Sequence, residues 1–251
     1  MRRSARLPVF FVAAGGFAAL FLAGLRGLPP FQQYRGPYGY VLNAISVPQR
    51  GITDVVSAVN FDFRGFDTLG EEYILFTSVI GVVALLRRLA GETRPAQEQT
   101  APGRPEVETS DATRVFTLTL VGMVTLFGLY IVSHGQISPG GGFQGGTILA
   151  TSPLMVYLAG DFESFRRIAS TRLVEPAEAL GAAGYAFIGL AAMALGFAFL
   201  YNFIPQVGPG TVISGGTVAL IDATVGLEVA AGFVLLLTTF LEEFLSGRGS
   251  R

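Results

Sequence analysis

Residues 216–241 read GTVALIDATVGLEVAAGFVLLLTTFL, an apolar run that holds two acidic side chains and no basic one. About 20 mainly apolar residues are enough for a helix to cross the hydrocarbon core of a bilayer. The run therefore predicts a membrane-spanning helix, and it places Asp222 and Glu228 well inside the membrane.

Five further apolar runs have the same character. Val9–Leu25, Val115–Val132 and Ala179–Phe203 meet or approach the required length, whereas Tyr73–Leu86 and Phe143–Ala159 reach it only with their polar or glycine-rich flanks. The composition agrees, because 14% of the residues are charged, against about 25% in an ordinary soluble domain. We therefore expect an all-α, polytopic membrane protein with about six transmembrane helices.

The basic residues predict the orientation of these helices. All seventeen are arginine, and the six-span arrangement puts thirteen on one side, three on the other and Arg26 near a boundary. Since cytoplasmic loops carry the excess of basic residues, both termini are expected in the cytoplasm. A further span at Thr53–Phe63 would spoil this asymmetry, so that segment is expected to be an interfacial or partly inserted helix.

Residues 91–112 divide the chain. They are rich in Pro, Glu, Gln and Thr and nearly lack large apolar side chains, a composition that cannot bury a core. We expect a cytoplasmic linker between a two-span unit, residues 1–90, and a four-span unit, residues 113–251. A fusion of two polypeptides and a single protein with a loose loop would look alike at this point.

Asp222 and Glu228 are the first candidates for an ion or proton path. An ionised carboxylate near the bilayer centre costs at least about 2.5–3.5 kcal/mol on insertion scales, so such residues face protein or water. Six residues along a helix correspond to about 9 Å of rise and some 120° of rotation. The two carboxylates are therefore stepping stones and not a paired acid–base site. A hydrogen bond that serves only packing is the competing interpretation.

Charged residues also gather before the run that begins at Tyr73. Asp67 suits a helix N-terminus, and Glu71 and Glu72 suit the positive end of its dipole. If the span begins earlier, Glu71 or Glu72 enters the membrane and needs a partner such as Arg64. Asp67, Glu71 and Glu72 are therefore candidates for the same path, although helix capping alone explains much of the pattern.

A glycine-rich segment follows the only histidine, His134. His134 is a candidate for proton uptake, because histidine titrates near neutral pH, but a capping or interfacial role fits it equally well. The segment matches neither the phosphate-binding nor the dinucleotide-binding pattern. Close helix packing by small residues is expected instead, beside a wet path. The residues assigned to this packing motif are Pro139, Gly140, Gly141, Gly142, Phe143, Gly145 and Gly146.

Missing residue types restrict the chemistry. Without cysteine there is no disulfide, iron–sulfur cluster or thiolate metal site, and without lysine any lysine-based proton relay belongs to another chain. One isolated histidine is a poor metal site. A net charge of −1 gives no electrostatic case for nucleic acid. We expect no cofactor and no metal, and therefore no enzyme activity of the chain by itself.

Two motifs resemble a known family. Residues 133–146, SHGQISPGGGFQGG, resemble the signature of the MrpB (MnhB) subunit of multisubunit sodium/proton antiporters, and the stretch around Asp222 is similar to that family's last span. Residues 62–71, DFRGFDTLGE, with Val55 and Val56 before them, resemble the C-terminal tail of the MrpA subunit, which is a separate small subunit in membrane-bound hydrogenases. Family members often carry histidine at the position of Gln136, so a two-histidine relay is not implied here.

The resemblance implies a multi-pass subunit of a bacterial or archaeal cell membrane, in a complex that exchanges protons for Na⁺ or another monovalent cation. The implied partners are large complex I-like subunits, other small membrane subunits and membrane lipids. Two alternatives remain. The chain could translocate ions within a membrane-bound hydrogenase or a related respiratory oxidoreductase, or it could be a structural subunit that only seals and orients its partners' helices.

Overall fold

The computed structural model describes residues 3–28, 36–86, 109–160 and 162–247. The chain divides into two compact units, Met1–Val41 and Leu42–Arg251. The first contains α1, Arg3–Arg26, whose stretch Phe11–Arg26 is apolar. Most of the predicted linker 91–112 lies outside the described residues, and the division of the chain at that point stays a prediction.

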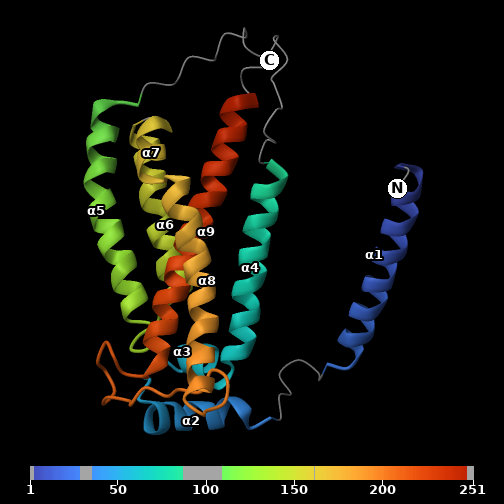
Figure 1. Cartoon of the computed structure of the whole chain (residues 1–251), viewed down its shortest axis with the longest axis vertical. Coiled ribbons are helices and arrows are strands. Elements are labelled where there is room, and N and C mark those ends of the chain that lie inside the picture. The colour runs from blue at the N-terminus through green and yellow to red at the C-terminus, as the bar shows by residue number, and fades with distance from the viewer. Residues whose placement is uncertain (1–2, 29–35, 87–108, 161, 248–251) are drawn as a thin grey trace. The chain divides into compact units, whose positions relative to one another are not determined.

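The second unit is a bundle of long helices with short helices at both ends: α2 and α3 lie at one end, and α7 lies towards the other (Figure 1). The long helices are α4, Gly65–Leu86; α5, Asp111–Ser133; α6, Gly142–Ala159; α8, Thr171–Ala194; and α9, Thr217–Gly247. The short elements are α2, Tyr38–Arg50, which begins in the first unit; α3, Val55–Ala58; the π-helix η1, Val59–Phe63; and α7, Phe162–Ile168. Apart from one β-bridge between Val207 and Ser214, the described residues form only helices and loops.

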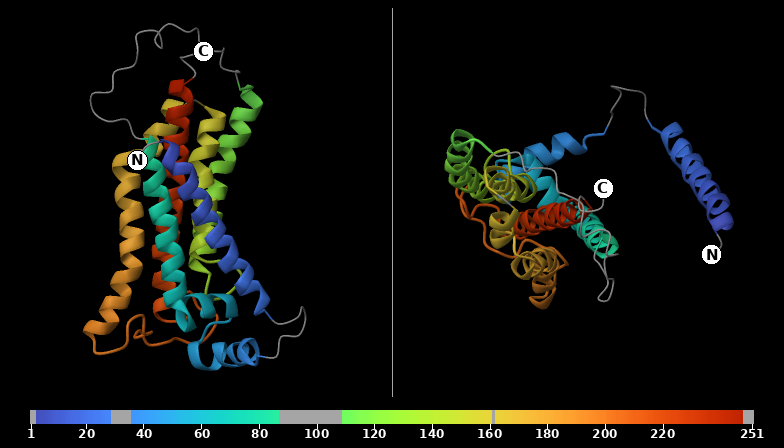
Figure 2. Two further views of the ribbon diagram at one scale, coloured as in Figure 1. Left: turned by 90° about the vertical axis from the view of Figure 1, so that its right-hand side faces the viewer. Right: turned by 90° about the horizontal axis from the view of Figure 1, so that it is seen from above.

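Helix α9 is the central element of the bundle. It packs against α8, α6, α4 and α5, while α5 packs mainly on α6. Seen from above, α9 lies between α6 on one side and α8 on the other (Figure 2). The helix that the sequence predicted most clearly is therefore the one around which the bundle is built.

The all-α membrane architecture is confirmed. In the described part of the chain, four helices are long and apolar enough to cross a bilayer: Gly65–Leu86, Asp111–Ser133, Thr171–Ala194 and Thr217–Glu243. Helices also occupy the other two predicted positions, but the apolar part of α1 is shorter, and α6 has 18 residues with a glycine-rich start and Pro153 inside it. That α1 and α6 cross the membrane remains a prediction.

Two helices, α8 and α4, have boundaries that lie eight or more residues from the ends of the predicted apolar runs. Helix α8 begins at Thr171, eight residues before the predicted Ala179, and ends at Ala194 instead of Phe203. The end is set by Gly196, whose φ of +86° favours glycine. The amides of Gly196 and Phe197 then donate to the carbonyls of Met193 and Ala192, at 2.9 and 3.0 Å, which closes a Schellman motif.

Helix α4 begins at Gly65, before the apolar run from Tyr73 and before Asp67, which the sequence suggested as its cap. Asp67, Glu71 and Glu72 therefore all lie inside the helix. Its start is held from outside: the Tyr185 hydroxyl of α8 donates to the Gly65 carbonyl at 2.8 Å, and the Thr68 hydroxyl donates to the Asn60 carbonyl at 2.7 Å. The earlier start carries Glu71 and Glu72 into the candidate span.

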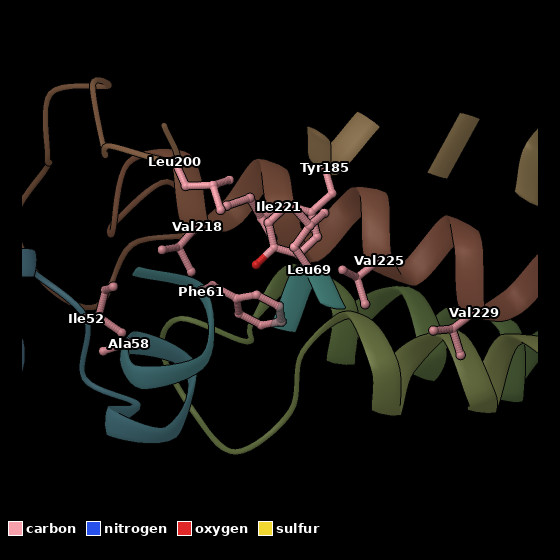
Figure 3. Close-up of a cluster of buried hydrophobic side chains, with 10 residues drawn as sticks. All are labelled: Ile52, Ala58, Phe61, Leu69, Tyr185, Leu200, Val218, Ile221, Val225 and Val229. Atoms are coloured by element: carbon pink, nitrogen blue, oxygen red, sulfur yellow. The ribbon is translucent and has the colours of Figure 1, made fainter. Parts of the chain in front are cut away.

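The segment predicted as interfacial, Thr53–Phe63, contains α3 and η1, of four and five residues. The Asp54 side chain caps α3 by accepting from the Val56 amide at 3.0 Å. Phe61 of η1 lies with Leu69 of α4 and Tyr185 of α8 against Ile221 and neighbouring residues of α9 (Figure 3). This cluster fixes the start of α4 on α9 and so determines which carboxylates face the interior.

Candidate functional site

The glycine segment brings α6 into backbone contact with α9. A methyl group at Gly142 would lie 2.7 Å from the Val225 Cβ, and one at Gly146 would lie 2.8 Å from both the Gly226 carbonyl and the Val229 Cβ. Real side chains do not approach so closely. The glycines therefore permit the packing of small residues that the sequence predicted.

The rest of the segment turns the chain from α5 into α6. Gly141 adopts a φ of +127°, which favours glycine, and its amide donates to the Ile131 carbonyl of α5 at 3.2 Å. A methyl group at Gly145 would lie 2.8 Å from the Gly128 carbonyl of α5. Pro139 is exposed and Gly140 is half-buried in the turn, whereas the Phe143 ring meets Phe233 of α9 edge-on at 6.4 Å.

Asp222 of α9 lies against this turn. Its side chain is fully buried, and its Oδ1 accepts a hydrogen bond of 2.8 Å from the Gly142 amide, at the first residue of α6. The carboxylate thus occupies the positive end of the α6 dipole. A methyl group at Gly135 would lie 2.6 Å from its Oδ2, an oxygen with no hydrogen-bond partner among the described residues. The glycine motif and Asp222 therefore form one structure, although they are far apart in sequence.

Three further carboxylates converge from three helices. Glu72 of α4, Glu178 of α8 and Glu228 of α9 are 5%, 3% and 1% exposed. Glu228 lies within electrostatic range of both others. None of the three forms an ion pair with a described basic residue, and each has at least one oxygen without a hydrogen-bond partner in the described chain. We call Glu72, Glu178 and Glu228 the carboxylate cluster.

Close helix packing builds this cluster. A methyl group at Gly181 of α8 would lie 2.6 Å from the Glu228 Cα, so the two helices touch at that level. One turn along α9, a methyl group at Gly232 would lie 3.5 Å from the Glu178 Oε1. Sequence reasoning missed Glu178, because it precedes the apolar run from Ala179. Its signal was an acid next to an apolar run, inside a helix that begins earlier than hydropathy suggested.

Glu72 is reached through a cavity. This cavity, about 290 Å³, is lined by α3, η1, α4 and the start of α6, including Ser57, Thr68, Glu71, Glu72 and Gln144. The Ser57 hydroxyl in its wall is buried and has no partner among the described residues. Gly140 and Phe143 line it too. The cavity thus joins the glycine segment to the carboxylate cluster.

The remaining acidic candidates from the sequence lie outside this interior. Arg64 forms an exposed ion pair with Asp67, its Nε donating to the Asp67 Oδ2 at 2.6 Å. Asp67 does not line the cavity. Glu71 does line it, but its side chain is exposed. Among Asp67, Glu71 and Glu72, only Glu72 is buried.

His134 caps the end of α5. Its Nδ1 lies 2.9 Å from the Tyr130 carbonyl and 3.1 Å from the Ser133 hydroxyl, and its ring packs on the Tyr130 ring at 3.9 Å. Gln136 is buried and donates to the Val212 carbonyl. Its own backbone carbonyl accepts from the Thr53 amide at 3.1 Å. Gln136 therefore ties three segments together as a structural residue.

A partly buried ion pair supports the same end of the bundle, and sequence reasoning did not find it. The Arg50 Nε lies 2.7 Å from the Asp62 Oδ2, and the Arg50 guanidinium covers the Phe63 ring at 5.4 Å. Burial raises the pKa of Asp62, while Arg50 and a hydrogen bond from Asn202 act in the opposite direction. Asn202 also accepts from the Thr217 amide at 2.9 Å and so caps α9.

The described residues contain no group of three or more His, Cys, Asp and Glu placed to hold a metal ion. The arrangement instead provides a line of acidic groups along α9. Asp222 lies nearest the start of that helix, Glu228 follows, and Glu178 lies beside Gly232. At 1.5 Å of rise per residue, the two steps cover about 9 and 6 Å.

Two family models match the chain, one over its C-terminal part and the other over its N-terminal part. Residues 112–235 match the family model of the domain related to the MnhB subunit of Na⁺/H⁺ antiporters, and residues 1–106 match the model of MbhE, a subunit of MBH. An uncharacterised protein of Methanocaldococcus jannaschii is 32% identical over 206 residues, or 76% of this chain and 78% of that protein. The A/B subunit of a probable K⁺/H⁺ antiporter of Rhizobium meliloti is 30% identical over 128 residues, 44% of this chain but 12% of the relative.

Two solved structures share the fold. A chain of the membrane-bound sulfane sulfur reductase, an archaeal respiratory membrane complex, has a TM-score of 0.67 and 29% identity, and the match covers 98% of this chain and 99% of that one. A chain of the Mrp complex from Dietzia sp. has a TM-score of 0.66 and 22% identity, over 95% of this chain and 26% of the other. The chain therefore belongs to the MnhB-related family of cation/proton antiporter membrane subunits, with an N-terminal region of the MbhE type.

Proposed function

We propose that the chain works as a membrane subunit of a multisubunit monovalent cation/proton antiporter, and that its buried carboxylates border the path of the cation or proton. The observation that carries this proposal is the carboxylate cluster, which three helices assemble without a described basic partner. Ionised groups at this depth are costly unless water, a proton or a cation compensates them. A path for ions supplies that compensation.

The cavity beside Glu72 is the opening of the path on the side of the glycine segment. Water or a partly hydrated cation in the cavity reaches Glu72 past the hydroxyls of Ser57 and Thr68. From Glu72 the line continues to Glu228 and then to Glu178, deeper along α9. Asp222 borders the line where it anchors the start of α6.

The partners we propose are large complex I-like subunits, which hold the lysine relays that this chain lacks, together with other small membrane subunits and lipids. Exposed apolar side chains along α5, among them Phe116, Met123 and Leu126, give such neighbours a surface to cover. Sodium is the proposed cation, the termini are proposed to be cytoplasmic, and residues 91–112 are proposed as the linker between the units. The chain is proposed to carry no enzymatic step itself.

Glu228→Gln tests the proposal, because it keeps the shape of the side chain and removes its charge. In everted vesicles that contain the whole complex, we expect the rate of cation-dependent proton exchange to fall roughly tenfold or more. A tenfold fall corresponds to an increase of about 1.4 kcal/mol in the activation free energy. Glu175→Gln is the matched control, since Glu175 is exposed on α8, about one turn before Glu178. Native gels report assembly. Unchanged exchange by an intact E228Q complex would refute the ion path. If E228Q instead prevents assembly of the complex, the purely structural role is favoured.

A second candidate function rests on a specific observation. The chain and its counterpart in an archaeal respiratory complex match over nearly their whole lengths. The same module would then translocate ions within a redox assembly. Purification of the native complex in mild detergent separates the two: co-purified hydrophilic iron–sulfur subunits would favour the redox assembly, and a set of membrane subunits alone would favour the antiporter.

A further inference from the structure

A second cavity, of about 370 Å³, lies at the opposite end of the bundle from the glycine segment. It is formed where α7 ends, α8 begins and α9 approaches its end, the region at the top of Figure 1. Arg166 of α7, Arg172 of α8 and the hydroxyl residues Ser170, Thr171 and Thr238 line it. The ion path proposed above makes no use of it.

The arginines of this cavity are available to a ligand. Neither Arg166 nor Arg172 forms an ion pair with another residue in the described part of the chain, whereas Arg167, next along α7, pairs with Glu163 at 3.6 Å. Two such guanidinium groups over one concavity suit a phosphate, because the planar fork of donors matches phosphate oxygens. Ser170 gives α8 no side-chain cap, so the first amides of that helix add donors on the same side.

The cavity also lies at the depth where phosphates of lipids are found. Thr171 begins one candidate span and Glu243 ends another, so the cavity sits at the level of the membrane surface. Leu173 and Ile168, next to the lining residues, are 69% and 56% exposed and offer an apolar surface for an acyl chain. Basic pockets between membrane helices bind anionic headgroups in this way.

We propose that this cavity is a binding site for the phosphate of an anionic lipid headgroup, with Arg166 and Arg172 as its principal ligands. Glu242, the one carboxylate among the described residues of the lining, opposes the bound anion. The site therefore makes two predictions of opposite sign: loss of the arginines weakens lipid binding, and loss of the Glu242 charge strengthens it. A change that merely damaged the fold would not produce the gain.

The test uses the full chain in its complex, delipidated in mild detergent and examined by native mass spectrometry after addition of phosphatidylglycerol. We expect the wild type to retain phosphatidylglycerol, and R166Q/R172Q to bind it roughly tenfold more weakly. Arg167→Gln is the matched control, because Arg167 lies outside the lining and should leave binding unchanged. Glu242→Gln should bind more tightly than the wild type.

Two further arms identify the source of the phosphate. Phosphatidylcholine should bind more weakly than phosphatidylglycerol, and inorganic phosphate should not displace the anionic lipid. The proposal is overturned if R166Q/R172Q binds phosphatidylglycerol as the wild type does, or if R167Q weakens binding equally. It is also overturned if inorganic phosphate displaces the lipid, since the site would then be one for a free anion. None of these outcomes bears on the ion path.

Discussion

Asp222 shows how one residue joins two features that appear separate in the sequence. Its depth in the membrane follows from hydropathy alone, and so does the expectation that it needs a partner. That its partner is the first amide of α6 does not follow, because the two residues are brought together only when α6 packs on α9. A carboxylate and a helix N-terminus stabilise each other within about one turn, so Asp222 supports α6 whether or not ions pass it.

Two substitutions separate these roles of Asp222. Asp222→Asn keeps an oxygen that accepts from the Gly142 amide, whereas Asp222→Ala leaves that buried amide unpaired at a cost of about 1–3 kcal/mol. We therefore expect D222A to unfold at a clearly lower temperature in detergent than D222N, and D222N to lose exchange while it retains assembly. Equal thermal stability of the two variants would show that the hydrogen bond to Gly142 contributes little.

The burial of Glu178 and the pairing of Arg50 with Asp62 could not be predicted from the sequence. Glu178 stands at the edge of an apolar run, where hydropathy does not distinguish a solvated acid from a buried one. Only the packing of Gly181 on Glu228 and of Gly232 beside Glu178 turns it inward. Arg50 and Asp62 are likewise ordinary in sequence, and they pair because α2 and η1 meet at the end of the bundle, where the Asp62 side chain is buried and that of Arg50 half-buried.

At the scale of elements, apolar runs predicted the helices well and their ends poorly. The start of α4 and the end of α8 are set by contacts that hydropathy does not register. Hydroxyl-to-carbonyl bonds from Tyr185 and Thr68 hold the start of α4, and a positive φ at Gly196 ends α8. The glycine segment, predicted to serve close packing, lies where added methyl groups at Gly142, Gly145 and Gly146 would meet the backbone of neighbouring helices.

The α6–α9 contact yields a test with a control in the same bundle. Gly146→Ala places a methyl group 2.8 Å from the Gly226 carbonyl and the Val229 Cβ, and overpacking of this kind costs about 1–3 kcal/mol. Gly122→Ala adds the same group to α5 where nothing lies within 4 Å, so its helix gains about 0.5–1 kcal/mol. Thermal unfolding in detergent should therefore move in opposite directions. A G146A protein as stable as wild type would mean that α6 shifts without cost.

At the scale of the whole molecule, the two ends of the bundle differ in kind. One end holds α3, η1, the glycine turn and the cavity of Glu72, and the other holds the arginine cavity of α7, α8 and α9. The sequence predicted a polarity of this kind from its arginines, since basic residues mark the cytoplasmic side. What hydropathy could not provide is that carboxylates from three helices share the interior, because their meeting depends on how α4 and α8 dock on α9.

The absence of cysteine from the sequence allows this polarity to be measured on the working protein. Thr109, just before α5, and Thr211, in the loop before α9, are both exposed, and α5 and α9 begin at opposite ends of the bundle (Figure 1). If the arginine-rich end is cytoplasmic, a membrane-impermeant maleimide added to intact cells should label Thr211→Cys and spare Thr109→Cys until the cells are permeabilised. Denatured samples, in which both variants should react, control for partner subunits that cover either site. The reverse pattern would place the cavity of Glu72 on the cytoplasmic side, and cations would then enter the carboxylate line from the cell interior.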